Sequence, residues 1–318
     1  MKKSILYTLF ASLFIALSCD AAITLRNGKI IDADAVATLP VQEHFSVGLQ
    51  AVEQENWAEG AKQFRIVTQN FPSSPYAPEG YYYLGVSEFF LDEIDFANEA
   101  FSAYLKAKNN PKFFQEAIEY KFAIAEKLRS GYKKRFFGMK QLPKWAPGST
   151  LAMELYDEVI AALPCHDVAA RALYSKAFML WNEKQYKRAV DSFQLVIKRF
   201  PKNELAPESY VAISQIFLEQ SRTEFQNPDV LEFAQINLRR FKSDFPREER
   251  IQDVEEDLKT INEVYAKGVY DTGLFYERVG KPMASVIYYQ NAIRLFPNTE
   301  IAQRCMERLE VLQLCSPR

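Results

Sequence analysis

The sequence predicts an all-α fold, an α-solenoid of about five to six helical hairpins. Three observations support this prediction. Glycine is scarce, with 11 residues in 318, and strand-like alternation is rare. One segment has the spacing of two packed helices, and the dipeptide Phe-Pro recurs after several predicted helices. Because 48% of the residues are hydrophobic and 25% are charged, the chain has enough apolar surface for a long core, which argues against disorder.

The segment from Leu173 to Pro201 shows the helical hairpin most clearly. Its apolar residues follow the period of one helix, a polar turn interrupts them at 182–185, and a second amphipathic helix ends at the proline, which lacks an amide hydrogen. Small Ala177 and Ala189 let the two helices approach closely, and Phe193 fills the remaining space. This spacing is that of a tetratricopeptide repeat (TPR), a unit that buries its apolar face only against neighbours.

Five further units with this pattern are expected along residues 42–314. They are marked in chain order by Gly48 with Phe64, Gly85 with Phe101, a helix from Phe113 to Arg129 with Tyr156, Ala234 with Phe241, and Gly273 with Tyr289. A last helix from Ile301 to Leu314 is expected to cap the array. In such an array each unit packs mainly on its neighbours. The array either continues unbroken or divides into two halves near Pro164–Asp167, within one domain.

The four Phe-Pro pairs fall at the same phase of the repeat, directly after its second helix. They are Phe71-Pro72, Phe200-Pro201, Phe245-Pro246 and Phe296-Pro297. We expect each proline to set the turn and each aromatic ring to pack under the following unit. The recurrence at one phase is a more specific signal of a helical repeat than any single pair.

The N-terminus predicts export and a lipid anchor. Residues 1–3 carry two lysines, and residues 5–17 form an apolar run that is too short to span a bilayer. Ser18 then precedes Cys19, which indicates a lipoprotein signal peptide over 1–18 and lipidation of Cys19, followed by a tether over 19–41 with a short extended piece. The alternative is ordinary signal-peptidase cleavage near Ala21 or Ala22.

Composition and motifs argue against several functional classes. The net charge of −2 shows no bias toward nucleic acid. H-E-x-x-H, G-x-S-x-G and phosphate-binding glycine loops are absent from the sequence, so we expect a non-enzymatic protein without a cofactor. The acidic run at 255–257 is interpreted as a solvated helix face. A zinc site is not expected, because His44 and His166 lack a cysteine pair.

Three cysteines follow the lipidation site: Cys165, Cys305 and Cys315. An odd number in an exported chain leaves at least one thiol unpaired within it. If one continuous helix holds Cys305 and Cys315, it keeps them about 15 Å apart, too far for a disulfide.

The most unusual local feature is an insertion at 129–148. No acidic residue occurs between Glu126 and Glu154, and seven lysines and arginines lie in that interval. Aromatic residues are interleaved with them: Tyr132, Phe136, Phe137 and Trp145. One interpretation is a projecting basic and aromatic loop that contacts anionic lipid headgroups or an acidic partner. The alternative is that the aromatic residues pack the loop back on its own solenoid while the lysines are solvated.

A second aromatic cluster begins at Tyr81-Tyr82-Tyr83. Consecutive residues point to different sides of a helix, so these three side chains cannot all enter the core. Tyr81 and Tyr82 are therefore candidates for a peptide-binding groove, where aromatic rings with polar tips are suitable. The alternative is ordinary packing between repeats.

With the lipidation signal and the repeats together, the chain resembles the BamD family (also called YfiO or ComL) of bacterial outer-membrane assembly lipoproteins. The resemblance runs from about Gln42 to Leu309. Its best carriers are the segments ENWAEGAKQFRIVTQNFPSSPYAPEGYYYLGVSEFF and YDTGLFYERVGKPMASVIYYQNAIRLFPNTE. Phe136-Phe137-Gly138 is similar to a Phe-Phe-Gly in the family's own insertion.

The resemblance implies a lipid-anchored scaffold on the periplasmic face of the outer membrane. Its expected partners are a BamA-like barrel subunit, other assembly lipoproteins and unfolded barrel precursors. The N-terminal repeats would favour extended substrate segments, and the C-terminal repeats would dock the barrel subunit. Arg278 and Tyr276 match the family's last repeat and are candidate partner contacts, together with Phe136, Phe137 and Trp145.

Two features depart from the family. The chain has six helical pairs where the family usually has five repeats, and Asp20 directly after the lipidated cysteine favours the inner membrane in enteric bacteria. Two alternatives therefore stay open. One is another envelope adaptor, such as a cell-wall or division coordinator, and the other is an envelope enzyme with a helical superhelix.

Overall fold

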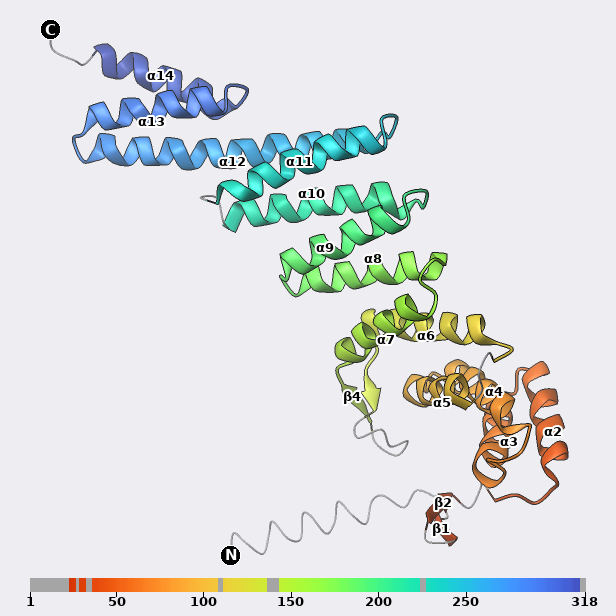
Figure 1. Ribbon diagram of the computed structural model, residues 1–318. Helices are drawn as coiled ribbons and strands as arrows, with labels where there is room; N and C mark the ends of the chain where they lie inside the picture. The colour runs from red at the N-terminus through yellow and green to blue at the C-terminus, as the bar shows by residue number, and fades with distance from the viewer. Residues whose placement is uncertain are drawn as a thin grey trace, which may run out of the picture. The chain divides into compact units, whose positions relative to one another are not determined.

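The computed structural model describes residues 23–26, 29–32, 36–107, 111–135, 143–223 and 227–314 (Figure 1). In these ranges thirteen helices, α2 to α14, form nearly all of the regular structure, and two short antiparallel hairpins complete it. The helices form six pairs followed by α14, so the all-α solenoid prediction is confirmed. The chain divides into two compact units, unit 1 over 1–163 and unit 2 over 164–318.

Unit 1 contains three helical pairs and both hairpins. The short hairpins are β1 (Ile23–Arg26) with β2 (Lys29–Asp32), inside the predicted tether, and β3 (Lys134–Arg135) with β4 (Lys144–Ala146), inside the insertion. The helices are α2 (Val41–Glu53), α3 (Trp57–Asn70), α4 (Ala77–Phe90), α5 (Ile94–Ala107), α6 (Phe114–Arg129) and α7 (Ser149–Ala162). Each packs on the next in chain order.

Unit 2 contains three further pairs and the capping helix. The helices are α8 (Asp167–Asn182), α9 (Tyr186–Arg199), α10 (Leu205–Thr223), α11 (Pro228–Asp244), α12 (Ile251–Arg278), α13 (Pro282–Leu295) and α14 (Glu300–Leu314). The 28-residue α12 is the longest helix and packs on α10, α11, α13 and α14. None of the described helices is both long enough and apolar enough to cross a bilayer.

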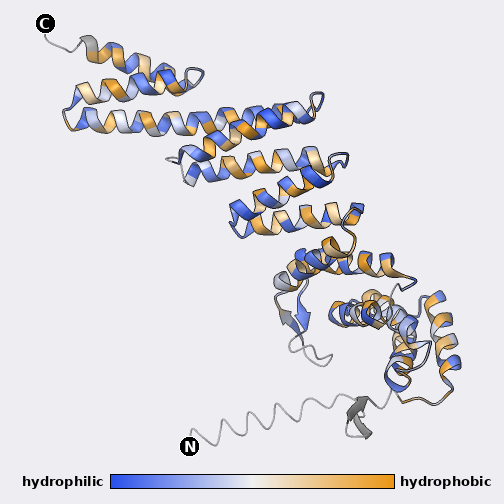
Figure 2. Ribbon diagram, viewed as in Figure 1, coloured by the Kyte–Doolittle hydropathy of each residue, from blue (hydrophilic) through white to orange (hydrophobic). Residues whose placement is uncertain are grey.

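The helices pair through small residues that meet aromatic rings. Hydrophobic and hydrophilic residues alternate along the helical ribbons, as amphipathic helices require (Figure 2). A Cβ atom at Gly85 would lie 2.8 Å from the ring of Phe101, and one at Gly273 would lie 2.5 Å from the ring of Tyr289. In the segment that predicts the repeat most clearly, Ala177 is fully buried. The small residues therefore allow the backbone of one helix to approach the ring of its partner.

Five helices end in the same hydrogen-bonded turn. After α2, α4, α6, α8 and α12, one amide donates to the carbonyl five residues earlier and the preceding amide donates to the carbonyl three residues earlier, which is the Schellman motif. This motif needs one residue with positive φ. Glycine supplies it at Gly131 and Gly280, but Glu55, Asp92 and Lys184 adopt φ of 57°, 58° and 61°. The same turn therefore forms after α2, α4 and α8 although no glycine marks it in the sequence.

The four Phe-Pro pairs occupy one structural position. Phe71, Phe200, Phe245 and Phe296 are the C-cap residues of α3, α9, α11 and α13, with φ between −127° and −133°. Phe245 packs against the buried cluster that includes Val254 of the following α12. For this pair, the prediction that the ring supports the next unit is confirmed.

Candidate protein-interaction site

The predicted site residues separate in the structure. Cys19, Phe136 and Phe137 lie outside the described residues. Tyr81, Tyr82 and Trp145 belong to unit 1, and Tyr276 and Arg278 lie near the end of α12 in unit 2.

Tyr82 belongs to the packing between repeats. Its ring stacks on Phe113 with centroids 4.4 Å apart and lies 5.4 Å from Tyr104, and the residue is only 9% exposed. This burial raises the pKa of its hydroxyl. The assignment of Tyr82 to a peptide groove is therefore corrected, because α4 directs this ring toward α5 and the start of α6. Tyr81 is half-buried, and its role in a groove stays a prediction.

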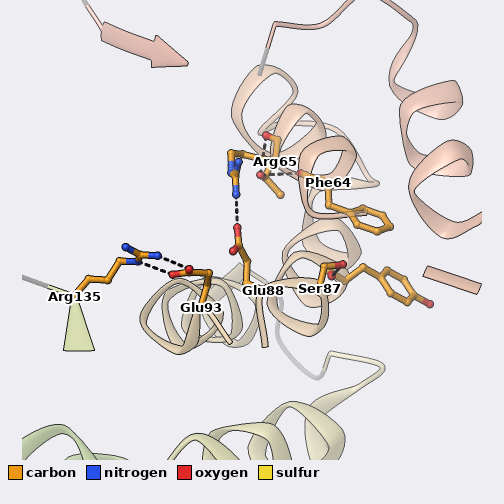
Figure 3. Close-up of polar contacts among 8 residues, drawn as sticks. Phe64, Arg65, Ser87, Glu88, Glu93 and Arg135 are labelled. Carbon is orange, nitrogen blue, oxygen red and sulfur yellow. Dashed lines mark hydrogen bonds and ion pairs between the residues drawn. The ribbon is translucent and has the colours of Figure 1, made fainter. Parts of the chain in front are cut away.

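The ends of the insertion are tied to the turn between α4 and α5. Arg135 donates two hydrogen bonds to Glu93 (Figure 3). Its backbone amide donates to the carboxylate of Asp95 over 2.7 Å. Lys127 pairs with the carboxylate of Asp92, and Lys144 donates to the Asp92 carbonyl over 2.7 Å. The hydrogen bond from Lys127 holds the pKa of Asp92 below its ordinary value.

The described ends of the insertion match neither interpretation in full, and residues 136–142 lie outside the described residues. Arg135 and Lys144 contact acidic or carbonyl oxygens of unit 1, and Lys127 just before the insertion pairs with Asp92, so these cations are not simply solvated. The aromatic residues do not all pack back either, since Trp145 on β4 is 70% exposed. Contact of Trp145 with a partner stays a prediction. Figure 3 also shows Arg65 of α3 reaching buried Glu88 of α4, a second ion pair that joins successive helices of unit 1.

The largest group of exposed apolar side chains in one hairpin lies where α12 meets α13. Phe275 and Val279 occur one turn apart at the end of α12, and Met283 and Ile287 occur one turn apart at the start of α13. These four residues, here named the C-terminal apolar surface, are between 47% and 76% exposed. Exposed apolar side chains of this size, two on each helix of one hairpin, make the hairpin a candidate for contact with a protein.

Local sequence makes the hairpin below this surface rigid. Gly280 adopts φ of 71° in the turn, and Pro282 begins α13 at a position where a missing amide costs nothing. Behind the surface, Tyr289 donates a hydrogen bond of 2.6 Å to Glu277, which also accepts one of 2.5 Å from Arg308 on α14. The two helices that carry the surface are therefore joined to each other and to α14.

The carboxylate of Glu277 is ionised in this network. Burial raises its pKa, but the hydrogen bonds from Arg308 and Tyr289 outweigh that effect, and the net pKa lies below the ordinary value. The ion pair therefore joins the end of α12 to α14 at neutral pH.

Arg278 and Tyr276 lie on different sides of α12. Arg278 is exposed and stands three residues after Phe275, so it borders the C-terminal apolar surface. Tyr276 is half-buried, and its ring stacks on Tyr288 of α13 with centroids 5.2 Å apart. The structure thus places one of the two predicted contacts beside the surface and uses the other to join the hairpin. Their roles in partner binding stay predictions.

The surface itself is absent from the sequence predictions. The sequence nevertheless contains a pattern that could have predicted it. Phe275 and Val279, and likewise Met283 and Ile287, are apolar residues four positions apart and therefore lie on one side of a helix. They fall outside the positions that mark the repeat core, such as Gly273 and Tyr289. Apolar pairs away from the core positions of a repeat point to a second contact face.

The histidines and cysteines have ordinary structural environments. His44 is buried with Nδ1 2.6 Å from Gln63, and His166 caps α8. Cys165 is exposed, Cys305 is buried, and burial raises the pKa of the Cys305 thiol to about 11. Cys315 lies outside the described residues. Across the described ranges, no group of three side chains is suited to hold a metal ion.

Comparisons with known proteins identify one repeat and a set of structural neighbours. A family model for the tetratricopeptide repeat matches residues 171–203, the α8–α9 pair. No curated protein matches the sequence. A TPR repeats protein from Bacteroides fragilis shares 12% identity at a TM-score of 0.42, over 86% of this chain and 100% of its own. MamA from Desulfovibrio magneticus RS-1 shares 14% at 0.38, over 68% and 95%.

A third neighbour is a tetratricopeptide repeat protein from Parabacteroides merdae, with 12% identity and a TM-score of 0.38 over 84% of this chain and 97% of its own. None of these likenesses assigns a partner. The matched repeat, within an array of helical pairs, indicates a scaffold for protein partners or peptides.

Proposed function

We propose that this chain is a lipid-anchored scaffold of the outer-membrane β-barrel assembly machinery. It binds the periplasmic part of a BamA-like barrel subunit through the C-terminal apolar surface. The observation that carries the proposal is the exposure of Phe275, Val279, Met283 and Ile287 on a rigid hairpin bordered by Arg278. The resemblance of residues 270–300 to the last repeat of the BamD family supports this choice of partner.

The chemistry of the surface defines what the partner presents. Burial of the four apolar side chains supplies the driving force, at about 25 cal/mol for each Å² removed from water. A cation at the rim contributes to orientation and rate more than to affinity. The contact face of the barrel subunit is therefore apolar at its centre, with a carboxylate opposite Arg278.

The anchor and the remaining partners complete the proposal. Lipid attached to Cys19 holds the scaffold on the periplasmic face of the outer membrane through burial of acyl chains. The scaffold also meets other assembly lipoproteins and unfolded barrel precursors. Asp20 makes the inner membrane the competing location, and density-gradient separation of the two membranes distinguishes them.

The test is a mild-detergent pull-down of the native chain, followed by mass spectrometry. We expect the wild type to retain a BamA-like barrel subunit in stoichiometric amount, and Met283→Asp to lose it because a carboxylate cannot be buried in an apolar contact. Leu195→Asp is the matched control, since Leu195 is an exposed apolar residue of α9 in the same unit.

Two results would contradict the proposal. Recovery of a cell-wall or division protein in place of a barrel subunit would reject the assembly role and support another envelope adaptor. Recovery of the barrel subunit by Met283→Asp at the wild-type level would reject the C-terminal apolar surface as the contact. Equal thermal midpoints for the wild type and both variants show that the folds are comparable.

A further inference from the structure

Unit 2 contains a groove between α9 and α11 with α10 as its floor and a volume of about 1010 Å³. No residue of the C-terminal apolar surface lines it. Along α11 the lining runs from Asp229 to Asp244, a rise of about 22 Å for fifteen helical residues. That length matches about six or seven residues of extended chain. The groove is thus shaped for a polypeptide segment more than for a compact ligand.

The middle of the groove is apolar and includes one aromatic ring that is still half exposed. Ile213 and Phe217 of α10 are buried and form the floor. Phe233 of α11 lies beside them with its ring centroid 6.3 Å from that of Phe217, yet it is 52% exposed. A ring placed next to a buried aromatic floor forms a contact for one large apolar side chain of a ligand.

One end of the groove carries two cations from different helices. Lys198 lies in the last turn of α9, and Arg240 lies in the second half of α11. The end of α9 lies close to the second half of α11, as shown by Ile197 of α9, which packs against the buried cluster that contains Tyr210 and Phe241. Lys198 and Arg240 are named here the cationic end.

The charges of the cationic end are available. Within the described ranges, neither of its two side chains takes part in an ion pair. The nearby carboxylate of Asp244 accepts a hydrogen bond of 2.6 Å from Tyr210. At the opposite end, Lys187 is accompanied by Asp191 and Asp229, so positive charge does not dominate there. The groove therefore favours a negative group at one end only.

We propose that this groove binds an extended protein segment that carries a large apolar side chain and, about three residues away, an aspartate or glutamate. The spacing follows from the positions of Phe233 and Arg240, which are seven residues apart in sequence and so about 10 Å apart along α11. An extended chain covers that distance in about three residues. The inference goes beyond the proposed function, since it requires neither a barrel subunit nor a lipid anchor.

The test is selection of octapeptides from a random display library by the whole chain in mild detergent. We expect the wild type to enrich segments with an aromatic or large aliphatic residue and an acidic residue three positions apart. The charge-reversed variant, Lys198→Glu with Arg240→Glu, exchanges this preference for lysine or arginine at the same position. A misfolded variant cannot produce such an exchange.

A second variant tests the apolar contact. Phe233→Ser is expected to weaken the most enriched peptide about tenfold in a fluorescence anisotropy titration. Lys202→Glu with Arg239→Glu is the matched control, because both residues are exposed and neither lines the groove. Met283→Asp is expected to leave the selected motif unchanged, which separates this inference from the proposed function. The peptide-binding role of the groove would be overturned if the wild type enriched no motif, or if the charge-reversed variant enriched the same motif as the wild type.

Discussion

Arg135 and Glu93 form a two-point ion pair although forty-two residues separate them in the sequence, and each side chain is only 17% exposed. The guanidinium comes from the insertion, and the carboxylate comes from the turn between α4 and α5. A pair with this geometry and burial constrains the first strand of the insertion against the second repeat.

Removal of this ion pair is expected to destabilise unit 1. Arg135→Ala leaves Glu93 without its two hydrogen bonds and lowers the free energy of unfolding by about 2 kcal/mol, measured by urea denaturation. Lys133→Ala is the control, because Lys133 is exposed in the same segment. In a double-mutant cycle with Glu93→Gln, additive effects would show that the pair is not coupled.

The helix end at Glu55 is expected to improve with glycine. Glu55 adopts φ of 57°, where a side chain costs about 1 kcal/mol. Glu55→Gly is therefore expected to raise the thermal midpoint, and Glu55→Val is expected to lower it because a β-branched side chain fits this conformation poorly. Calorimetry of the two variants checks this, and a lower midpoint for the glycine variant would show that the turn is not strained.

The network at Glu277 predicts a defined pH dependence. Its pKa is lowered in the folded chain, so the unfolded chain binds more protons in the acidic range. The stability contributed by Glu277 is therefore present above its ordinary pKa and is lost as the pH falls through the folded value. We expect Glu277→Gln to cost about 1 kcal/mol in urea unfolding at about pH 7 and much less at about pH 3. A pH-independent difference between the two proteins would contradict this.

The two described thiols are expected to differ in reactivity. Cys165 is exposed, whereas Cys305 is buried with a pKa of about 11, so little of its reactive thiolate forms at neutral pH. Brief alkylation of the native chain followed by peptide mass spectrometry should find the label on Cys165 and not on Cys305. The same reaction in denaturant is the control, because it exposes both thiols. Equal labelling in the native chain would show that α14 opens readily.

The helical hairpins were predictable because their signals are local. The spacing of small and aromatic residues predicts a buried Ala177 in its repeat, and the first helix of the third unit begins and ends close to the predicted Phe113 and Arg129. Helix ends were harder to predict. The Schellman turns at Asp92 and Lys184 carry no glycine, so their positive φ is set by the hydrogen bonds of the turn.

The candidate site was predictable only in part. Helical spacing alone places Tyr276 and Arg278 on different sides of α12, but it does not show that Tyr276 stacks on Tyr288 or that Arg278 borders the C-terminal apolar surface. Tyr82 illustrates the opposite case. Its neighbours suggested an open face, whereas the start of α6 covers its ring through Phe113.

By itself, the sequence determined the repeat, its phase and the six helical pairs, because these depend on contacts within a few turns of helix. Tertiary structure decided which faces remain open and which charges are paired. Glu93 meets Arg135 because β3 of the insertion packs near the turn between α4 and α5. Phe233 of α11 stays exposed in the groove because helices from different repeats stack around it. The exposure of a side chain depends on which distant parts of the chain pack against it after folding, and the periodicity of a single helix does not predict those contacts.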